Sequence, residues 1–82
     1  MDVGITAHAR ERMRKYGISE ELVLAAVSNP TIVLPGYNDR KAYQKRINGY
    51  VIRVVAEEMK GIKICRVITV YKAKSGRYEI QI

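Results

Sequence analysis

A histidine and an arginine near the start of the sequence are its first candidates for chemistry. His8 and Arg12 are four residues apart, so on a helix they would lie on one face. A histidine can exchange protons near neutral pH, which suits acid–base catalysis. A lone histidine beside an arginine is also a common packing arrangement. The sequence leaves both interpretations of His8 open.

Basic residues in the second half are the candidates for binding phosphate. Arg46, Arg53 and Arg66 fall in separate β-rich segments, and arginine offers a planar fork of donors that lysine lacks. Other basic residues form two clusters, which consist of Arg40, Lys41, Lys45 and Arg46, and of Lys72, Lys74 and Arg77. Tyrosines are interleaved with them at Tyr37, Tyr43, Tyr50, Tyr71 and Tyr78. An aromatic ring beside an arginine can stack an unpaired base, so the combination favours nucleic acid.

The net charge of +7 belongs to one half of the chain. Residues 1–30 hold four basic and four acidic residues, whereas residues 31–82 hold eleven basic and four acidic ones. Positive charge localised in this way raises the local concentration of polyanions and speeds encounter with them. A solubilising surface would have the same composition, so the charge alone does not identify a partner.

The sequence lacks the residues that a metal site, a glycine-rich phosphate loop, an internal disulfide or a membrane-spanning segment would need. One histidine, the single cysteine Cys65 and scattered carboxylates are too few for a metal site, and no glycine-rich phosphate loop is present, so we expect no cofactor. Cys65 has no partner for an internal disulfide and is expected to be a small buried hydrophobe. No apolar run approaches the roughly 18 residues that cross a bilayer. We therefore expect a cytoplasmic protein with no membrane partner.

Two short helices should come first and position His8 and Arg12. Thr6 can cap a helix that runs to about Tyr16, because apolar residues recur there at helical spacing. Ser19 can cap a second helix. Asn29-Pro30 should end it, since a proline disfavours helical geometry at the preceding residue.

Short β-rich segments follow, at residues 31–34, 42–47, 50–57 and 62–71. Asn48-Gly49 is a strong signal for a two-residue hairpin turn, because both central residues of such a turn need a positive φ. A second hairpin should turn near residues 59–61, and a short strand or helix could follow Ser75-Gly76. The sequence thus predicts one α+β domain over residues 1–82, with two N-terminal helices packed on one face of an antiparallel sheet of about four strands.

The hairpin registers decide which side chains share a face of this sheet. A two-residue turn pairs Gln44 with Arg53 and places Arg46 on the same face as Arg53. A second turn of even length would place Arg53 directly opposite Arg66. Like charges at opposed positions destabilise a sheet, so this pair would need a bound polyanion or nearby carboxylates. The helix-covered face would hold Tyr43, Ile47, Ile52, Val54, Cys65 and Val67.

Two parts of the sequence resemble a known group of proteins. Residues 6–13 (TAHARERM) and 16–21 (YGISEE) resemble the opening of a widespread family of small uncharacterised domains, in which a helix with a histidine and an arginine leads into a second helix. Residues 49–55 and 66–74 are similar to the closing strands of that family and of BrnT-like toxins, which belong to the RelE and ParE toxin superfamily. The resemblance covers nearly the whole chain.

The resemblance implies a RelE-like fold whose open sheet face binds RNA and, in ribonuclease members, cleaves it. By position, it implies catalytic roles for His8, Arg53, Arg66 and Tyr71. It also implies that Arg12 and Thr69 join the basic residues of the two clusters in binding nucleic acid. Arginines would stabilise the negative charge that develops on a phosphate during cleavage.

These observations predict a toxin-like RNA-binding protein of a toxin–antitoxin pair. Whether it is also a metal-independent endoribonuclease, an mRNA interferase, is open at this level. One alternative is a non-catalytic basic interaction module that binds an acidic protein segment. Another is a ParE-like toxin that acts on a protein target. RNA, an antitoxin protein and a second copy of the chain are the candidate partners.

Overall fold

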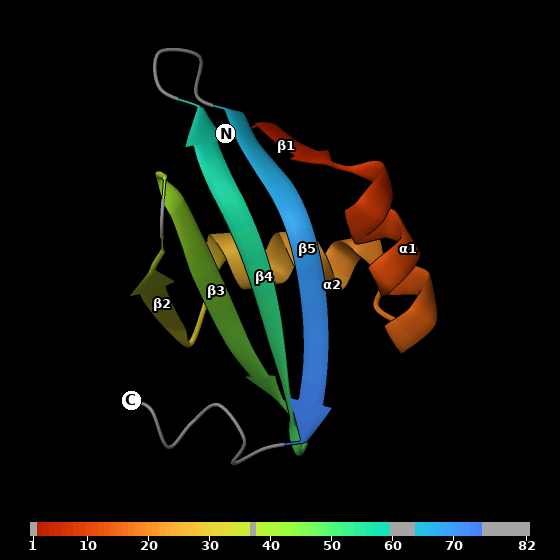
Figure 1. The fold of residues 1–82 in the computed structure, drawn as a ribbon. Coiled ribbons are helices and arrows are strands. Elements are labelled where there is room, and N and C mark those ends of the chain that lie inside the picture. The colour runs from red at the N-terminus through yellow and green to blue at the C-terminus, as the bar shows by residue number, and fades with distance from the viewer. Residues whose placement is uncertain (1, 37, 60–63, 75–82) are drawn as a thin grey trace.

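The computed structural model describes residues 2–36, 38–59 and 64–74, and has two helices and five strands there (Figure 1). The elements in chain order are β1 (Asp2–Ile5), α1 (Ala7–Tyr16), α2 (Glu20–Ser28), β2 (Ile32–Pro35), β3 (Arg40–Ile47), β4 (Tyr50–Met59) and β5 (Ile64–Lys74). The predicted turn near residues 59–61 and the segment after Ser75 lie mostly or wholly outside the described residues.

The five strands form one mixed sheet in the order β1-β5-β4-β3-β2. β1 is parallel to β5, and the other neighbouring strands are antiparallel. The predicted α+β class with two helices is confirmed, whereas the prediction of about four antiparallel strands is wrong. The fifth strand, β1, has only four residues and pairs with a segment about sixty residues later, so no local sequence pattern reveals it.

Both helices begin at the predicted capping residues. The Thr6 hydroxyl accepts a hydrogen bond from the Ala9 amide at 3.1 Å, and the Ser19 hydroxyl accepts one from the Leu22 amide at 3.2 Å. These bonds satisfy amide groups that have no partner within the first turn of a helix. Gly17 ends α1 with a φ of 67°, a left-handed conformation that favours glycine.

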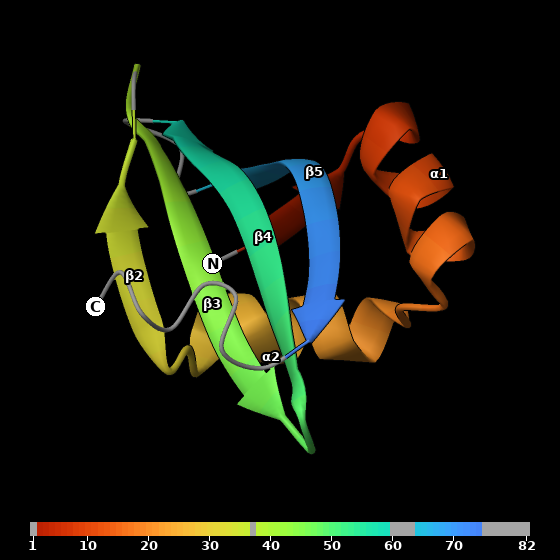
Figure 2. The ribbon, with the colours of Figure 1, turned by 60° about the horizontal axis from the view of Figure 1, so that its bottom comes forward.

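Thr6 also fixes α1 against the sheet. Its amide donates to the Val67 carbonyl and its hydroxyl donates to the Ile68 carbonyl, both at 3.2 Å. β1 pairs only with residues 64–67, so α1 takes the place beside the remainder of β5 where β1 ends (Figure 2). The first helix is therefore positioned along the second half of the last strand.

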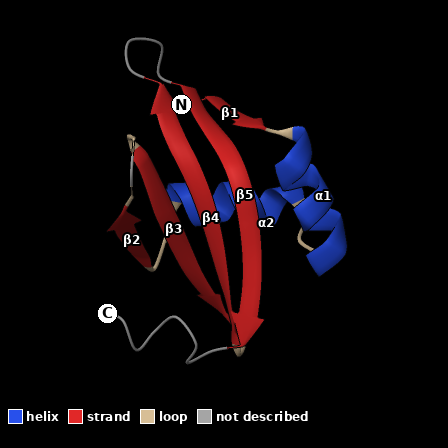
Figure 3. Cartoon of the chain, in the orientation of Figure 1, coloured by secondary structure: helices blue, strands red, loops and turns tan. Residues whose placement is uncertain are grey.

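The buried residues lie between the helices and one face of the sheet. Figure 3 shows α2 behind the strands. The predicted side chains of the helix-covered face all belong to this core, in which Tyr43, Ile52, Val54, Cys65 and Val67 are buried and Ile47 is partly buried. We call the opposite face the helix-free face, because neither described helix covers it and α1 contacts it only along the β5 edge.

The hairpin between β3 and β4 follows the prediction. Asn48 and Gly49 both have a positive φ, of 40° and 86°, and Ile47 lies opposite Tyr50. Gln44 consequently lies opposite Arg53, as the two-residue turn requires.

The predicted register between β4 and β5 is wrong. Arg53 lies opposite Tyr71, and Arg66 lies opposite Glu57. Two features cause the difference. β4 continues to Met59, so the connection to β5 comes later than predicted, and a β-bulge adds Ile68 between the residues opposite Val55 and Ala56. Arg53 and Arg66 still share the helix-free face, but they lie four positions apart along the ladder.

Candidate nucleic-acid interface

Six polar side chains from four elements meet at the β5 side of the helix-free face. The β-ladders bring Gln44 of β3, Arg53 of β4, and Thr69 and Tyr71 of β5 together, and α1 adds His8 and Arg12. We call these six residues the cross-strand site. Two adjacent rows make up the site, and each ends in a contact with α1. Thr69 and His8 form the first row. Gln44, Arg53, Tyr71 and Arg12 form the second row.

The first row ends on His8. Its Nε2 lies 3.3 Å from the Thr69 hydroxyl oxygen, a distance that fits a hydrogen bond in either direction, depending on the tautomer of the ring. His8 is exposed, whereas Thr69 is buried. The buried hydroxyl therefore orients a ring that solvent and a ligand can reach. The exposed position excludes core packing for His8 and agrees with both a helix-surface residue and a site residue.

The second row ends on Arg12. Its guanidinium carbon lies 5.8 Å from the centre of the Tyr71 ring, within the range of a cation–π contact. Tyr71 lies opposite Arg53, whose Nε donates to the Gln44 side-chain oxygen at 2.8 Å. Gln44 is only 2% exposed, so this bond fixes the plane of a partly exposed guanidinium. Two arginines from different elements thus lie on either side of Tyr71.

Basic residue types separate between the two faces of the sheet. By alternation along the strands, the described arginines of the sheet all lie on the helix-free face, and the described lysines of the sheet all lie on the other face. The arginines are Arg40, Arg46, Arg53 and Arg66, and the lysines are Lys41, Lys45, Lys72 and Lys74. The predicted basic residues therefore do not form one surface.

The sequence predicted that Arg66 lies opposite Arg53, but in the structure the two residues are apart. Its guanidinium pairs with Glu57 at 3.5 Å, and Arg40 pairs with the same carboxylate oxygen from the other side at 3.7 Å. The Glu57 carboxylate on β4 accounts for the two arginines on the flanking strands β3 and β5 without a bound polyanion. Arg40 and Arg66 thus form a partly neutralised row at some distance from the cross-strand site, whereas Arg46 lies diagonally across from Arg53.

The lysines have different surroundings. Lys41 pairs with Glu58 at 3.8 Å, and the Lys45 ammonium donates to the Asn29 carbonyl at the end of α2 at 2.9 Å. A cation at this position stabilises the carbonyl end of a helix. Lys72 and Lys74 line a pocket at the far end of β5, and Arg77 lies outside the described residues.

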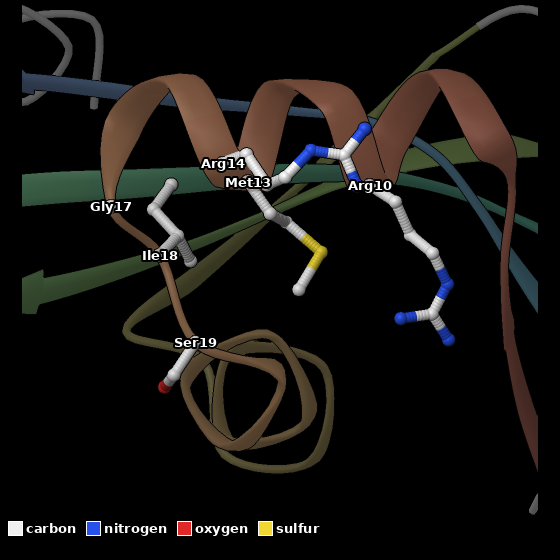
Figure 4. Close-up of a pocket in the computed structure, with 6 residues that line it drawn as sticks. All are labelled: Arg10, Met13, Arg14, Gly17, Ile18 and Ser19. Carbon is white, nitrogen blue, oxygen red and sulfur yellow. The ribbon is translucent and has the colours of Figure 1, made fainter.

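A second pocket lies between the end of α1 and the start of α2 (Figure 4). Arg10, Met13, Arg14 and the turn at residues 17–19 line it, and Arg10 forms an exposed ion pair with Glu20 at 3.6 Å. The pocket faces away from the cross-strand site, because His8 and Arg12 occupy a different side of α1.

The part of the chain that the structure describes has no metal-binding cluster and no membrane-spanning helix. No group of three or more histidine, cysteine or acidic side chains there could hold a metal ion. Neither helix is both long and apolar enough to cross a bilayer. Cys65 is buried, and burial, followed by the charge of Glu58, raises its pKa, which disfavours a reactive thiolate.

Sequence reasoning identified five of the six residues of the cross-strand site as functional candidates. It paired Gln44 with Arg53 correctly but gave Gln44 no role, because an amide in a strand has no distinctive sequence signal. The i, i+4 spacing of His8 and Arg12 was the most informative pattern, since both residues do reach one part of the sheet.

Comparison with known proteins gives one match. Residues 5–72 match a family described as a domain of unknown function, DUF4258, and this range includes all six residues of the cross-strand site. No curated protein and no solved structure matches the chain. The prediction of an uncharacterised domain family is thereby confirmed. The chain belongs to the DUF4258 family.

Proposed function

We propose that this chain is a toxin-like protein that binds single-stranded RNA at the cross-strand site, with a RelE-like fold and a relationship to BrnT-like toxins. One observation carries the proposal. The fold brings His8 and Arg12 to Thr69, Tyr71 and Arg53, residues that are far apart in the sequence and suited to phosphate and base contacts.

Electrostatics favour a phosphate ligand at this site. Arg12 and Arg53 flank Tyr71, and arginine can form two parallel hydrogen bonds with one phosphate. Arg46 extends the positive charge along the same face. In the Arg40–Glu57–Arg66 row, by contrast, the Glu57 carboxylate already pairs with both arginines.

We further propose that the site can cleave the RNA it binds. His8 would take the proton from a ribose 2′-hydroxyl, whose oxygen then forms a bond to the adjacent phosphorus. The bond from phosphorus to the 5′-oxygen breaks, leaving a 2′,3′-cyclic phosphate, and the Tyr71 hydroxyl would protonate the departing oxygen. Arg12 and Arg53 would stabilise the extra negative charge on the phosphate.

An antitoxin would inhibit this activity by occupying the same arginines. Acidic side chains of such a partner could pair with Arg12 and Arg53 in place of phosphate. RNA and antitoxin should therefore compete for the protein.

A charge-matched pair of double variants tests the RNA-binding proposal. Arg12→Gln with Arg53→Gln removes two positive charges from the cross-strand site, and glutamine at position 53 can still bond to Gln44. Arg10→Gln with Arg14→Gln removes two charges from the other side of α1. Binding of a fluorescent single-stranded RNA is measured by anisotropy at several salt concentrations, and thermal unfolding checks that both variants fold.

We expect the Arg12/Arg53 variant to lose at least about tenfold in affinity, because charge-assisted hydrogen bonds are lost. The slope of log affinity against log salt should become shallower by about 1.4, since each lost phosphate contact on a single strand contributes about 0.7. The Arg10/Arg14 variant should change both quantities far less. Equal effects of the two variants would show that RNA affinity depends only on the net charge of the protein, and would overturn the assignment of RNA binding to the cross-strand site.

A further inference from the structure

We infer that the pocket at the far end of β5, lined by Tyr16, Tyr50, Lys72, Ala73 and Lys74, binds a nucleotide through its base and its phosphate. The pocket has a volume of about 500 Å³, within the range of about 300–1,000 Å³ that is typical of small-molecule sites. The ligand could be a free mononucleotide or an unpaired residue of an RNA strand, and the experiment below distinguishes these sources.

The position of the pocket follows from the end of α1. Tyr50 begins β4 directly after the hairpin turn and lies opposite Lys74 at the end of β5. Its side chain is on the helix-covered face, in phase with Ile52, but α1 already ends at Tyr16. Tyr50 is consequently 44% exposed rather than buried in the core. A large aromatic ring is thus left accessible beside a second one.

Both tyrosine rings are next to ammonium groups. The Lys72 Nζ lies 4.5 Å from the centre of the Tyr50 ring, and the Lys15 Nζ lies 5.7 Å from the centre of the Tyr16 ring. Among the described residues, neither Lys72 nor Lys74 forms an ion pair with a carboxylate. The pocket therefore combines two aromatic rings with cations that have no acidic partner there.

A nucleotide matches this combination better than other anions do. A base can stack on a tyrosine ring more strongly than an exposed ammonium binds to it, so a base can displace Lys72 from Tyr50. The displaced ammonium would then be available to the phosphate of the same nucleotide. Inorganic phosphate would use only the lysines, and a simple aromatic compound would use only the rings.

The pocket lies further along α1 than the cross-strand site, on the side of the sheet to which Tyr50, Lys72 and Lys74 point. His8, Arg12 and Tyr16 are spaced four residues apart and so form one stripe on the helix, about 12 Å long at 1.5 Å per residue. Along β5, Thr69 and Tyr71 contact the first two members, and Ala73 lines the pocket with the third. An RNA strand that fills both sites must therefore pass from the helix-free face to the helix-covered face at the end of β5. This RNA form of the inference rests on the proposed function, whereas binding of a free nucleotide does not.

A single tryptophan tests the inference directly. The chain contains no tryptophan, so Tyr50→Trp keeps a flat ring in the pocket and adds a unique fluorescent reporter. Its fluorescence is followed during titration with adenosine 5′-monophosphate, single-stranded oligo(A), duplex RNA and inorganic phosphate. Tyr16→Trp provides a second reporter if the first variant does not fold.

We expect quenching by the mononucleotide and by oligo(A), and little or none by duplex RNA or inorganic phosphate. Adding Lys72→Gln and Lys74→Gln should weaken mononucleotide binding by about fivefold, because two exposed ion pairs with the phosphate are lost. Adding Arg10→Gln and Arg14→Gln should leave it nearly unchanged. Adding Arg12→Gln and Arg53→Gln should weaken oligo(A) binding but not mononucleotide binding.

The outcomes separate this inference from the proposed function. If RNA binds the wild type but no nucleotide or RNA quenches either reporter, the pocket inference is wrong and the cross-strand proposal stands. If the mononucleotide quenches while RNA binds nowhere, the pocket takes free nucleotides and the proposed function fails. Equal quenching by inorganic phosphate would exclude base stacking and overturn the inference.

Discussion

His8 owes its position to two neighbouring interactions rather than to its own chemistry. The Thr6 cap begins α1 beside β5, and the buried Thr69 hydroxyl lies 3.3 Å from the exposed imidazole. Arg12 is held one turn further on by the Tyr71 ring. A ring that is oriented from one side and accessible from the other is suited to proton transfer, so the role of His8 is testable apart from RNA binding.

His8→Asn should abolish RNA cleavage while leaving RNA bound. Asparagine keeps a polar side chain near Thr69 but cannot exchange a proton, and general acid–base catalysis typically contributes about 10²–10⁴ in rate. The cleavage rate is measured on isolated RNA and on ribosome-bound mRNA, with affinity measured in parallel. Cleavage at the wild-type rate would remove His8 from the mechanism. Loss of affinity equal to that of the Arg12/Arg53 variant would make His8 a binding residue instead.

At the residue scale, the sequence predicted local relationships better than distant ones. The spacing of His8 and Arg12 places both residues on one helix face, and the Asn48-Gly49 turn sets the Gln44–Arg53 pair. The predicted Arg53–Arg66 pair failed because it depended on the length of a later turn and on a bulge. Neither feature has a strong sequence signal, and each moves every residue that follows it along the ladder.

Among the elements, α1 has the position that matters most for the site. β1 covers the β5 edge only as far as Val67, and Thr6 bonds to the Val67 and Ile68 carbonyls where α1 begins. The sequence predicted α1, α2 and the hairpin because caps and turns are local signals. It did not predict β1, because these four residues form a strand only by pairing in parallel with β5, which is distant in the sequence.

Thr6→Val should therefore reduce both stability and RNA affinity. The variant loses the N-cap bond to Ala9 and the bond to Ile68, and loss of a cap alone costs about 0.5–2 kcal/mol. Because the second bond joins α1 to β5, its loss should also misplace His8 and Arg12. Urea unfolding gives the stability, and anisotropy gives the affinity.

Ser19→Ala is the matched control for this prediction. It removes the N-cap bond of α2, which has no residue in the cross-strand site. We expect a comparable loss of stability with unchanged RNA affinity. If both variants lost affinity in parallel with stability, the position of α1 would have no specific role.

Across the whole molecule, the two faces of the sheet carry different chemistry. The helix-covered face holds the apolar core with lysines toward its ends, and the helix-free face holds the arginines. The hairpin registers predicted that Arg46, Arg53 and Arg66 share the face opposite the core, which is confirmed, whereas the position of the lysines on the core face was not predicted. Among the buried core residues that the structure describes, Tyr43 and Cys65 are titratable.

Stability should fall in alkaline solution because of these two groups. Burial raises the pKa of Tyr43, as do the nearby charge of Glu58, that of Cys65 and the hydrogen bond to Glu58, and burial and Glu58 raise the pKa of Cys65. Both groups are neutral when protonated, so the folded state keeps its protons at pH values where the unfolded state releases them. The free energy of unfolding should therefore decrease as pH rises above about 8.5, the ordinary value for a thiol.

Tyr43→Phe combined with Cys65→Ala should flatten this decrease. The double variant is less stable at neutral pH, since it loses a hydrogen bond and buried volume. The informative quantity is the slope of the unfolding free energy between about pH 8 and pH 10, obtained from urea denaturation. A slope equal to that of the wild type would show that other groups cause the alkaline loss.

His8 is the only histidine in the chain, so its imidazole gives a unique set of NMR signals that can report on the cross-strand site. Titration with a short single-stranded RNA measures whether the ligand reaches this site. We predict that the His8 signals shift and saturate with the same affinity that anisotropy gives, and that the shift is lost in the Arg12→Gln/Arg53→Gln variant. RNA that binds with that affinity while the His8 signals stay unchanged would contradict the account.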